Sequence, residues 1–284
     1  MKQLFQRLIV FFIGLPFLII LILFLPQFNY LAFNCVVITV SILGALEFQN
    51  FLRQKNICVF PIEAAILGGL SPVAAAGAVC FNFGFLVIPG TLILGALWLL
   101  VSQIFSSDEK LDLSVNRSAA GFSVLIYPGS FMAWIIPLSL FPKPHIVISV
   151  FLLMTYLNDA AAWAAGICLG KKNRGIIPAS PNKSVAGFAG GLLASVAIGV
   201  IAALVLPGAF NSSPMPGPLA GAILGLIVGA AATLGDLGES ALKRSAGLKD
   251  SGFIIPGRGG ILDSIDSLAA AAPVYYIFYR ILFG

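Results

Sequence analysis

Long apolar runs separated by short polar segments dominate the pattern of this 284-residue chain. A helix that crosses the hydrocarbon core of a bilayer requires about 20 consecutive apolar residues. The pattern therefore predicts an all-α, polytopic integral membrane protein with about nine transmembrane helices. Their expected ranges are 8–25, 30–46, 62–81, 83–104, 119–141, 146–170, 184–206, 217–238 and 262–282. Only Asn82 separates the third run from the fourth, so these two runs are also compatible with a re-entrant pair.

Composition supports the same class. Residues of the apolar set AVILMFWYC make up 59% of the chain, only 10% are charged, and the mean hydropathy is +1.03. A soluble domain carries roughly 45–50% apolar and about 25% charged residues, so this chain has too little polar surface for water.

Lys2 and Arg7 precede the first apolar run as in a signal peptide. That run is longer than the usual stretch of about 7–15 residues and no small-residue cleavage site follows, so we expect a first transmembrane helix.

Basic residues test the helix count independently, because cytoplasmic loops are enriched in Lys and Arg. In the nine-helix arrangement, fourteen of the sixteen basic residues fall on one side of the membrane. They are Lys2, Arg7, Arg53, Lys55, Lys110, Arg117, Lys171, Lys172, Arg174, Lys183, Lys243, Arg244, Lys249 and Arg258, whereas Lys143 and Arg280 fall on the other side. The N-terminus is therefore expected inside and the C-terminus outside. The net charge of +5 then reflects topology and an attraction to phosphate-bearing lipids and nucleotides, and predicts no nucleic-acid partner.

Four scattered cysteines and a single histidine give no metal-binding or disulfide pattern. Cys35, Cys58, Cys80 and Cys168 form no CxxC pair, and His145 lies at the edge of an apolar run. A zinc site or a disulfide framework requires closely spaced or paired ligands, which are missing here. We expect the cysteines to be small core residues and His145 to be interfacial.

Acidic residues concentrate toward the C-terminus. Six of them lie within or beside the last four predicted helices: Asp159, Asp236, Glu239, Asp250, Asp263 and Asp266. A carboxylate in hydrocarbon costs about 2.5–3.5 kcal/mol even on lenient scales, so such residues are rare and usually functional. The alternative is a structural lattice of buried ion pairs. Glu47 and Glu63 are expected only at the membrane interface.

We divide the chain into two regions. The first, 1–141, holds five N-terminal helices, and the second, 142–284, is a catalytic region of four helices with two motif loops.

Two basic loops on the predicted cytoplasmic side favour phosphate binding. The loop before the ninth helix runs from Lys243-Arg244 through Lys249-Asp250-Ser251-Gly252 to Pro256-Gly257-Arg258-Gly259-Gly260. A glycine-rich turn that leads into a helix N-terminus presents backbone N–H groups and a positive dipole end to anions. Asp263 and Asp266 follow at once, which predicts a site for phosphate and a divalent metal together. The loop before the seventh helix adds Lys171, Lys172, Arg174 and Ser180-Pro181-Asn182-Lys183-Ser184.

At these residues the sequence resembles the phosphatidate cytidylyltransferase, or CDP-diacylglycerol synthase, family. Two short blocks match: Asn158-Asp159 with Trp163 and Gly166, and Ser180-Pro181-Asn182-Lys183-Ser184 with Gly187. The long family signature follows as Gly235-Asp236, Glu239-Ser240, Lys243-Arg244, Lys249-Asp250-Ser251-Gly252, Pro256-Gly257, Gly259-Gly260, Leu262-Asp263 and Asp266-Ser267. The spacing of this signature is very specific, whereas the N-terminal half matches only as hydrophobic helices.

The resemblance implies an Mg²⁺-dependent transfer of the cytidylyl group from CTP to phosphatidic acid, which yields CDP-diacylglycerol and pyrophosphate for phospholipid biosynthesis. It implies that Asp236, Asp263 and Asp266 hold the metal and act in catalysis with Lys243 and Arg244; a second cation is left open. The residues expected to bind substrate are Asn158, Asp159, Ser180, Lys183, Ser184, Glu239, Ser240, Lys249, Asp250, Gly257, Arg258, Gly259 and Gly260. We expect a multi-pass protein of the cell (inner or plasma) membrane with its site facing the cytoplasm. The oligomeric state, a homodimer included, is open.

Four positions depart from the family pattern. Val185 and Ala186 stand where the family has Trp-Glu, Arg258 replaces a histidine in the glycine turn, and Ser264 replaces an arginine. They remove no expected metal ligand but leave room for a different lipid or nucleotide preference. Two other classes remain: a secondary transporter, since intramembrane acids and broken helices also occur there, and a divergent CTP-using lipid kinase or inactive homologue. The clustering of charged motifs at one membrane face and the lack of an inverted repeat in the sequence favour the enzyme.

Single cysteines introduced at Asn182 and Asn211 test the topology, after replacement of the native cysteines. Asn182 lies in a loop predicted inside and Asn211 in a loop predicted outside. An impermeant thiol reagent added to intact cells should therefore label Asn211→Cys and leave Asn182→Cys unlabelled. Labelling of Asn182→Cys from outside would show that the nine-helix arrangement is wrong.

Overall fold

The computed structural model describes residues 13–284 except 15, 58, 85, 105–110, 212–214, 256 and 258. Helices form the regular structure of these residues, and the extended pairing consists of two isolated bridges, Arg174 with Ser184 and Ile255 with Gly259. The predicted all-α class is therefore confirmed. By its internal contacts the chain divides into two units, Met1–Pro137 with Leu242–Ile265 and Leu138–Ala241 with Asp266–Gly284.

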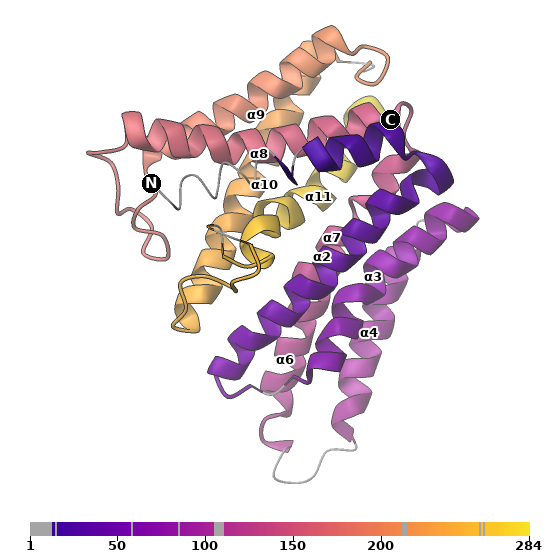
Figure 1. Ribbon diagram of the computed structural model, residues 1–284, viewed down its shortest axis with the longest axis vertical. Coiled ribbons are helices and arrows are strands. Elements are labelled where there is room, and N and C mark those ends of the chain that lie inside the picture. Colours follow the sequence, from indigo (N-terminus) through magenta and orange to yellow (C-terminus); the bar gives the residue numbers. More distant parts are fainter. Residues whose placement is uncertain are drawn as a thin grey trace. The chain divides into compact units, whose positions relative to one another are not determined.

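The first unit contains α2 (Gln27–Gln54), α3 (Pro61–Phe81), α4 (Val87–Ile104) and α6 (Ser114–Val124) (Figure 1). A π-helical turn, η1 (Leu125–Ser130), continues α6 into the short α7 (Phe131–Ala133), and the 3₁₀ helix η2 (Ile136–Leu140) follows. Pro61 begins α3, where its missing N–H costs no helical hydrogen bond, and Asn82 ends it with a φ of 56°. The third and fourth predicted runs are therefore two separate helices.

Close backbone contact holds α2, α3 and the π-helical turn together. A Cβ atom on Gly68 would clash with Ala45 of α2, and one on Gly129 would lie 2.9 Å from the carbonyl oxygen of Leu67. The Ser41 hydroxyl donates a hydrogen bond to the Gly68 carbonyl at 2.8 Å and also lies against the Pro128 carbonyl. Because a π-helical turn interrupts the regular helical pairing, a donor from a neighbouring helix stabilises this point.

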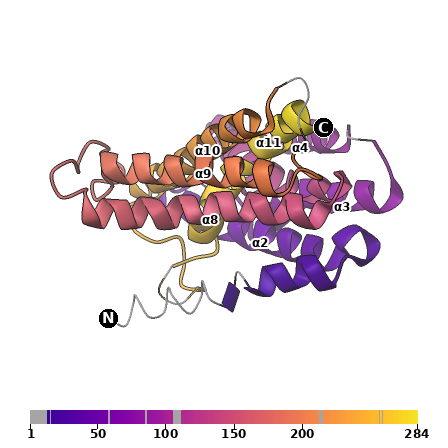
Figure 2. The ribbon, with the colours of Figure 1, turned by 90° about the horizontal axis from the view of Figure 1, so that it is seen from above.

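The second unit contains α8 (Pro144–Cys168), α9 (Val185–Val205), and most of α10 (Gly217–Ser245) and α11 (Leu262–Phe283). Helices α8 and α9 lie side by side (Figures 1 and 2). Gly199 of α9 faces Gly221 of α10 so closely that a Cβ on either would clash with the other's backbone. Small residues at such crossings allow helix backbones to approach where lipid supplies no hydrophobic driving force.

Tyrosines of α11 fix that helix within the second unit. The fully buried Tyr275 hydroxyl donates to the Val147 carbonyl of α8 at 2.9 Å, and Tyr279 donates to the Ala209 carbonyl. The Tyr279 ring also packs edge-on against Phe210, with centroids 5.3 Å apart. A buried phenol is stabilised when its hydroxyl has a partner, so each tyrosine contributes both ring packing and a defined register.

Seven described helices are long and apolar enough to cross a membrane. They correspond to the second through eighth predicted spans. Of the first predicted span, residues 16–24 are helical, whereas 8–12 and 15 lie outside the described residues. The ninth predicted span corresponds to the 22-residue helix α11, which contains Asp263, Asp266 and Arg280 and is not one of the seven. The count of nine therefore stays a prediction, as does the division into 1–141 and 142–284.

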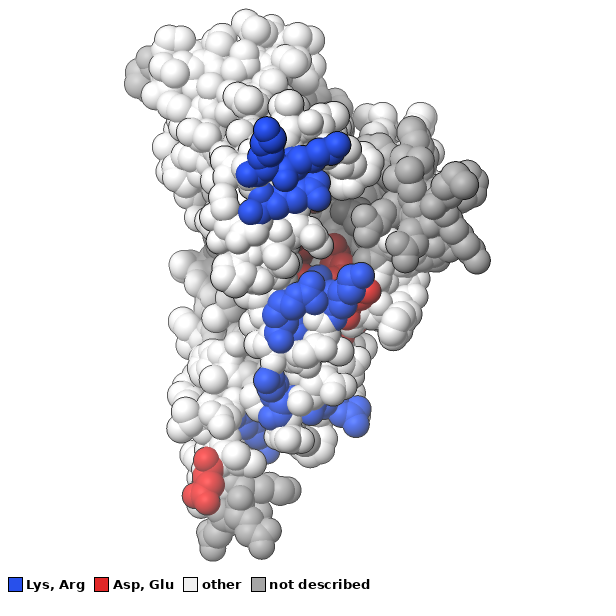
Figure 3. Space-filling model, turned by 90° about the vertical axis from the view of Figure 1, so that its left-hand side faces the viewer, with Lys and Arg blue, Asp and Glu red and all other residues white. Residues whose placement is uncertain are grey.

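Apolar side chains remain exposed on the helices of both units. Phe81, Ile104 and Val205 are 73%, 72% and 68% exposed. The face in Figure 3 is largely uncharged, with Lys and Arg confined to separate groups. Such extensive apolar exposure is unfavourable in water and normal against lipid, so the fold is that of a membrane protein.

A glycine-to-alanine pair tests the helix crossing in the second unit. Gly199→Ala should lower the free energy of unfolding by about 1–3 kcal/mol, because the added methyl forces α9 and α10 apart. Gly77→Ala in α3 is the matched control, since a Cβ there meets nothing within 4 Å and alanine favours the helix. Thermal unfolding in detergent measures both, and equal midpoints for the two variants would contradict the close crossing.

Candidate functional site

The segment between α10 and α11 is folded around the carboxylate of Asp263. The Oδ2 atom of Asp263 accepts hydrogen bonds from the backbone N–H of Ser251 at 2.8 Å and of Gly260 at 2.7 Å. The Oδ1 atom forms an ion pair with the ammonium of Lys243 in the last turn of α10. The Asp263 carboxylate at the start of α11 thus links two parts of the loop to each other and to the last turn of α10.

Backbone geometry requires glycine in this loop. Gly257 and Gly259 have φ values of 76° and 107°, which residues with side chains rarely adopt. Ile255 and Gly259 exchange backbone hydrogen bonds of 2.8 and 3.0 Å that close the turn. A Cβ atom on Gly260 would clash with the Ser251 hydroxyl and the Glu47 carboxylate. The fold therefore accounts for these glycines, and their contact with phosphate stays a prediction.

Glu47 of α2 holds the same loop, although the sequence pattern suggested for it only an interfacial position. The residue is 5% exposed, and its oxygens accept hydrogen bonds from the backbone N–H groups of Ile261 and Leu262 at 2.9 and 2.8 Å. These donors belong to the start of α11, where N–H groups have no intrahelical acceptor and the helix dipole favours a negative charge. The signal that could have identified Glu47 is a carboxylate within a long apolar helix.

Ser251 links the two carboxylates. Its Oγ lies 2.9 Å from Glu47 Oε2 and 2.8 Å from Asp263 Oδ2. A hydroxyl has one proton and donates to only one acceptor at a time. Asp263 Oδ2 already accepts two backbone N–H bonds, so donation to Glu47 leaves both carboxylates well satisfied. The backbone N–H of Asp263 donates to the same Oγ at 3.2 Å, which orients the hydroxyl further.

A second group of predicted site residues lies in the second unit. Asp159, Asp236 and Glu239 all lie close enough to Asp266 for their negative charges to repel its own. Glu239 is fully buried and Asp266 is 6% exposed. Lys183 forms an ion pair with Asp236. Four carboxylates from α8, α10 and α11 and the lysine of the loop before α9 are therefore brought together within one unit.

The chemistry of this acidic cluster fits a divalent cation. Carboxylate oxygens are ligands that Mg²⁺ prefers, and a cation relieves the repulsion between buried carboxylates. Among the described residues, however, no group of three or more His, Cys, Asp or Glu side chains is placed to hold a metal ion. A cation bound here would take one or two of these carboxylates and complete its ligands with water or phosphate oxygens. Asp263 contacts Lys243 in the first unit, and its predicted role as a metal ligand stays a prediction.

Internal hydrogen bonds stabilise the loop between α8 and α9, and Lys183 of this loop forms an ion pair with Asp236. The Gly175 N–H donates to the Pro181 carbonyl at 3.0 Å, and the Ser184 hydroxyl accepts from the Gly187 N–H at 3.1 Å. Ser184 is 2% exposed and caps α9, and the side chain of Lys183 is 25% exposed although its Nζ atom, which pairs with Asp236, is buried. The contact of either residue with substrate stays a prediction.

Asn158 joins three helices of the second unit. Its Nδ2 donates to Ser195 Oγ of α9 at 3.1 Å and to the Gly229 carbonyl of α10 at 3.3 Å, and the residue is 1% exposed. The next residue, Asp159, accepts a hydrogen bond from Ser267 Oγ at 3.2 Å. Asn158 thus positions the helix that carries Asp159, and its contact with substrate stays a prediction.

The remaining predicted site residues lie along α10 and the following loop. Arg244 is exposed and donates to the Leu248 carbonyl at 3.1 Å, and Lys249 and Asp250 are exposed. Ser180 and Ser240 are partly exposed, and Arg258 lies outside the described residues. Ser264, one of the family departures, donates from its hydroxyl to the Gly260 carbonyl at 3.3 Å. The structure thus brings Lys243, Gly260 and Asp263 together in the first unit, and Asp159, Lys183, Asp236, Glu239 and Asp266 together in the second.

Glu47→Gln tests the attachment of the loop. The amide keeps the shape but turns one of two acceptors into a donor that faces the N–H groups of α11, so we expect a loss of about 1–3 kcal/mol. Hydrogen exchange of the backbone amides of 248–262 in detergent should become correspondingly faster. Glu63→Gln, which removes a longer ion pair of 3.6 Å with Arg117, is the control. Unchanged exchange in Glu47→Gln would mean that Glu47 does not hold the loop.

Known proteins are similar to this chain over much of its length. The model of the cytidylyltransferase family matches residues 5–282. The uncharacterized protein YnbB of Escherichia coli (strain K12) is 32% identical over 208 residues, 71% of this chain and 65% of its own length. Phosphatidate cytidylyltransferases are 42% identical over 138 residues in Synechocystis sp. (46% of this chain, 44% of the relative) and 32% identical over 206 residues in Brucella suis biovar 1 (70% and 72%). The matched segments span less than two thirds of the first two relatives. Because the family model matches nearly the whole sequence, this chain belongs to the cytidylyltransferase family.

Proposed function

We propose that the protein transfers the cytidylyl group of CTP to phosphatidic acid. A phosphate oxygen of phosphatidic acid attacks the α-phosphorus of CTP and forms a new P–O bond. The bond from the α-phosphorus to the oxygen that bridges to the β-phosphorus breaks, and its electron pair leaves with pyrophosphate. The products are CDP-diacylglycerol and pyrophosphate. The similarity of this chain to the phosphatidate cytidylyltransferases of Synechocystis and Brucella suis supports this choice of substrates.

The observation that carries the proposal is the glycine-rich loop held by Asp263. The loop joins Lys243 at the end of one helix to the first turn of the next, an environment in which backbone N–H groups and cations favour phosphate. Exposed Arg244 and Lys249 on the same segment add cationic groups that can orient a triphosphate. We propose that this segment binds the phosphates of CTP.

The acidic cluster Asp159, Asp236, Glu239 and Asp266 is our proposed site for Mg²⁺. When bound, Mg²⁺ would neutralise the charge on the transferring phosphoryl group and on pyrophosphate. Lys183, paired with Asp236, adds a positive charge beside this cluster. The phosphate of phosphatidic acid is already anionic, so none of these residues has to remove a proton from the nucleophile.

We further propose that the protein lies in the cell membrane with this site toward the cytoplasm. The support is the placement of fourteen of sixteen basic residues on one side of the predicted topology. CTP is a charged, soluble substrate and reaches a membrane enzyme from the aqueous side, which agrees with that orientation.

An assay with CTP labelled at two positions tests the proposed reaction. Purified protein in detergent receives phosphatidic acid, Mg²⁺ and CTP labelled at either the α- or the γ-phosphorus, and the lipids are separated by thin-layer chromatography. Label from the α-position should appear in the lipid product, and label from the γ-position should leave as pyrophosphate. Lipid labelled from the γ-position would indicate a lipid kinase, and no labelled lipid in either arm would contradict the proposal.

Asp263→Asn should lower the rate of transfer by roughly 100-fold or more, which corresponds to about 2.7 kcal/mol in the barrier. The amide loses the charge that pairs with Lys243 and one of the acceptors that hold the loop. Asp112→Asn, at an exposed position outside the proposed site, is the control and should keep wild-type activity. Near-wild-type activity of a folded, inserted Asp263→Asn protein would show that the site is assigned wrongly.

A further inference from the structure

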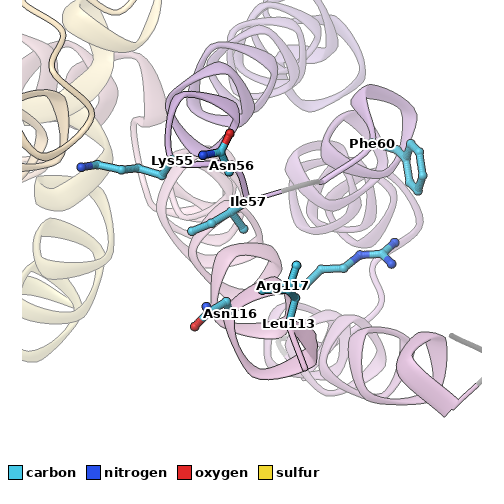
Figure 4. Close-up of a pocket in the computed structure, with 7 residues that line it drawn as sticks. All are labelled: Lys55, Asn56, Ile57, Phe60, Leu113, Asn116 and Arg117. Atoms are coloured by element: carbon cyan, nitrogen blue, oxygen red, sulfur yellow. The ribbon is translucent and has the colours of Figure 1, made fainter. Parts of the chain in front are cut away.

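A basic pocket lies in the first unit, where the segment after α2 meets the start of α6. It has a volume of about 360 Å³. Its lining residues are Lys55, Asn56, Ile57, Phe60, Leu113, Asn116 and Arg117 (Figure 4). None of them belongs to the family signature or to the acidic cluster, so the proposed reaction leaves this pocket without a role.

Arg117 gives the pocket its strongest anion-binding group. Its guanidinium lies 3.6 Å from Glu63, too far for a hydrogen bond, and 5.5 Å from the centre of the Phe60 ring. The Nε atom is buried and has no hydrogen-bond partner among the described residues. A buried guanidinium N–H that lacks a partner is costly, and a phosphate oxygen is a strong acceptor for it.

The first turn of α6 forms part of the pocket wall. Leu113 occupies the N-cap position, and no side chain caps the helix. The first N–H groups of a helix have no intrahelical acceptor, and an anion in front of them is stabilised by the helix dipole. Asn116 in the same turn contributes a side-chain amide at the pocket wall.

The charged groups in and around the pocket carry a net positive charge. Lys55 and Arg117 supply two positive charges, and Glu63 beside Arg117 supplies one negative charge. In Figure 4 the Lys55 side chain extends away from Arg117. It is exposed, so a change of rotamer can bring its ammonium toward an anion in the pocket. The net charge of these three groups favours a phosphate.

The apolar rim consists of Phe60 and Leu113, which line the pocket and are 56% and 53% exposed. Ile62 and Val115, each two residues further along the chain, are 76% and 79% exposed. In the predicted topology this rim lies at the cytoplasmic end of transmembrane helices, where the headgroups of anionic lipids are found. A soluble phosphate compound would gain nothing from these side chains, whereas the acyl chains of a lipid would cover them.

We propose that this pocket binds the phosphate group of an anionic phospholipid, with the acyl chains lying along the apolar rim. The inference goes beyond the proposed transfer reaction and does not depend on it, because binding requires neither CTP nor a metal. The phosphate could belong to a structural lipid of the leaflet or to phosphatidic acid itself. The two share one recognition chemistry, and direct binding measurements separate them.

Native mass spectrometry of the intact chain in detergent tests the proposal without CTP or Mg²⁺. Phosphatidylglycerol, phosphatidic acid and phosphatidylcholine are titrated separately, and inorganic phosphate is added as a competitor. We expect saturable binding of one anionic lipid, weaker binding of phosphatidylcholine, and little competition by inorganic phosphate. Tighter binding of phosphatidic acid than of phosphatidylglycerol would identify the substrate lipid as the occupant, and equal binding would identify any anionic lipid.

Two variants and one matched control locate the binding. Arg117→Gln removes the guanidinium, and Asn116→Asp places a negative charge at the pocket while leaving the Arg117–Glu63 pair in place. Each should weaken binding of the anionic lipid about tenfold, or about 1.4 kcal/mol. Arg53→Gln removes an exposed charge near the end of α2 that does not line the pocket and should change binding less than twofold.

The exposed Asn116→Asp change keeps the proposal testable even if Arg117→Gln fails to fold. Wild-type lipid binding by folded Asn116→Asp would overturn the proposal. Full displacement of lipid by inorganic phosphate would overturn its lipid part. Loss of transfer activity with intact lipid binding would count against the proposed reaction alone, so the two failures are distinguishable.

Discussion

The hydrogen bonds from the start of α11 and from Ser251 to Glu47 fix the glycine-rich loop in space. Glu47 is separated from its partners Ser251, Ile261 and Leu262 by 204, 214 and 215 positions in the sequence. A buried carboxylate is tolerated only when its oxygens are satisfied, and here two backbone N–H groups and a hydroxyl satisfy them. The requirement is mutual, because the start of α11 also needs an acceptor for its first N–H groups. A helix of the N-terminal half therefore takes part in building the signature loop.

Asp263 depends on the same arrangement. Ser251 provides a backbone N–H to Asp263 and a hydroxyl to Glu47, so one residue positions both carboxylates. Gly260 leaves room for the two carboxylates, because any side chain there would clash with Glu47 and Ser251. Hydrogen bonds to Glu47 and Asp263, which both accept from Ser251, therefore hold the loop in place. This explains why the described residues of a segment with little hydrophobic packing, in which Phe253 is 98% exposed, nevertheless form regular backbone hydrogen bonds.

Much of the fold followed from local features of the sequence. Apolar runs of bilayer length predicted α3, α4, α8, α9 and α10, because such runs have one stable arrangement in lipid, a helix with its own backbone hydrogen bonds. The π-helical turn at Pro128 and the bonds of Ser41 were not predictable, since they depend on which helix packs beside which. The sequence pattern singled out six acidic residues within or beside the last four predicted helices, and the structure brings four of them, Asp159, Asp236, Glu239 and Asp266, together. Glu47 was expected only at the membrane interface, because its partners lie at the other end of the chain and no local pattern identifies them. Asn158 and Ser184 were expected at the substrate, yet their observed contacts are with neighbouring helices and a helix end, because short polar side chains also serve these structural purposes.

A double-mutant cycle between Glu47→Gln and Ser251→Ala measures the central interaction most directly. The free energy of unfolding in detergent is determined for the wild type, the two single variants and the double variant. If Glu47 holds the loop through Ser251, the double variant should lose clearly less stability than the sum of the single losses, with a coupling of about 1 kcal/mol or more. Losses that add to within about 0.5 kcal/mol would show that the two residues act independently. That result would contradict a glycine-rich loop organised from the N-terminal half.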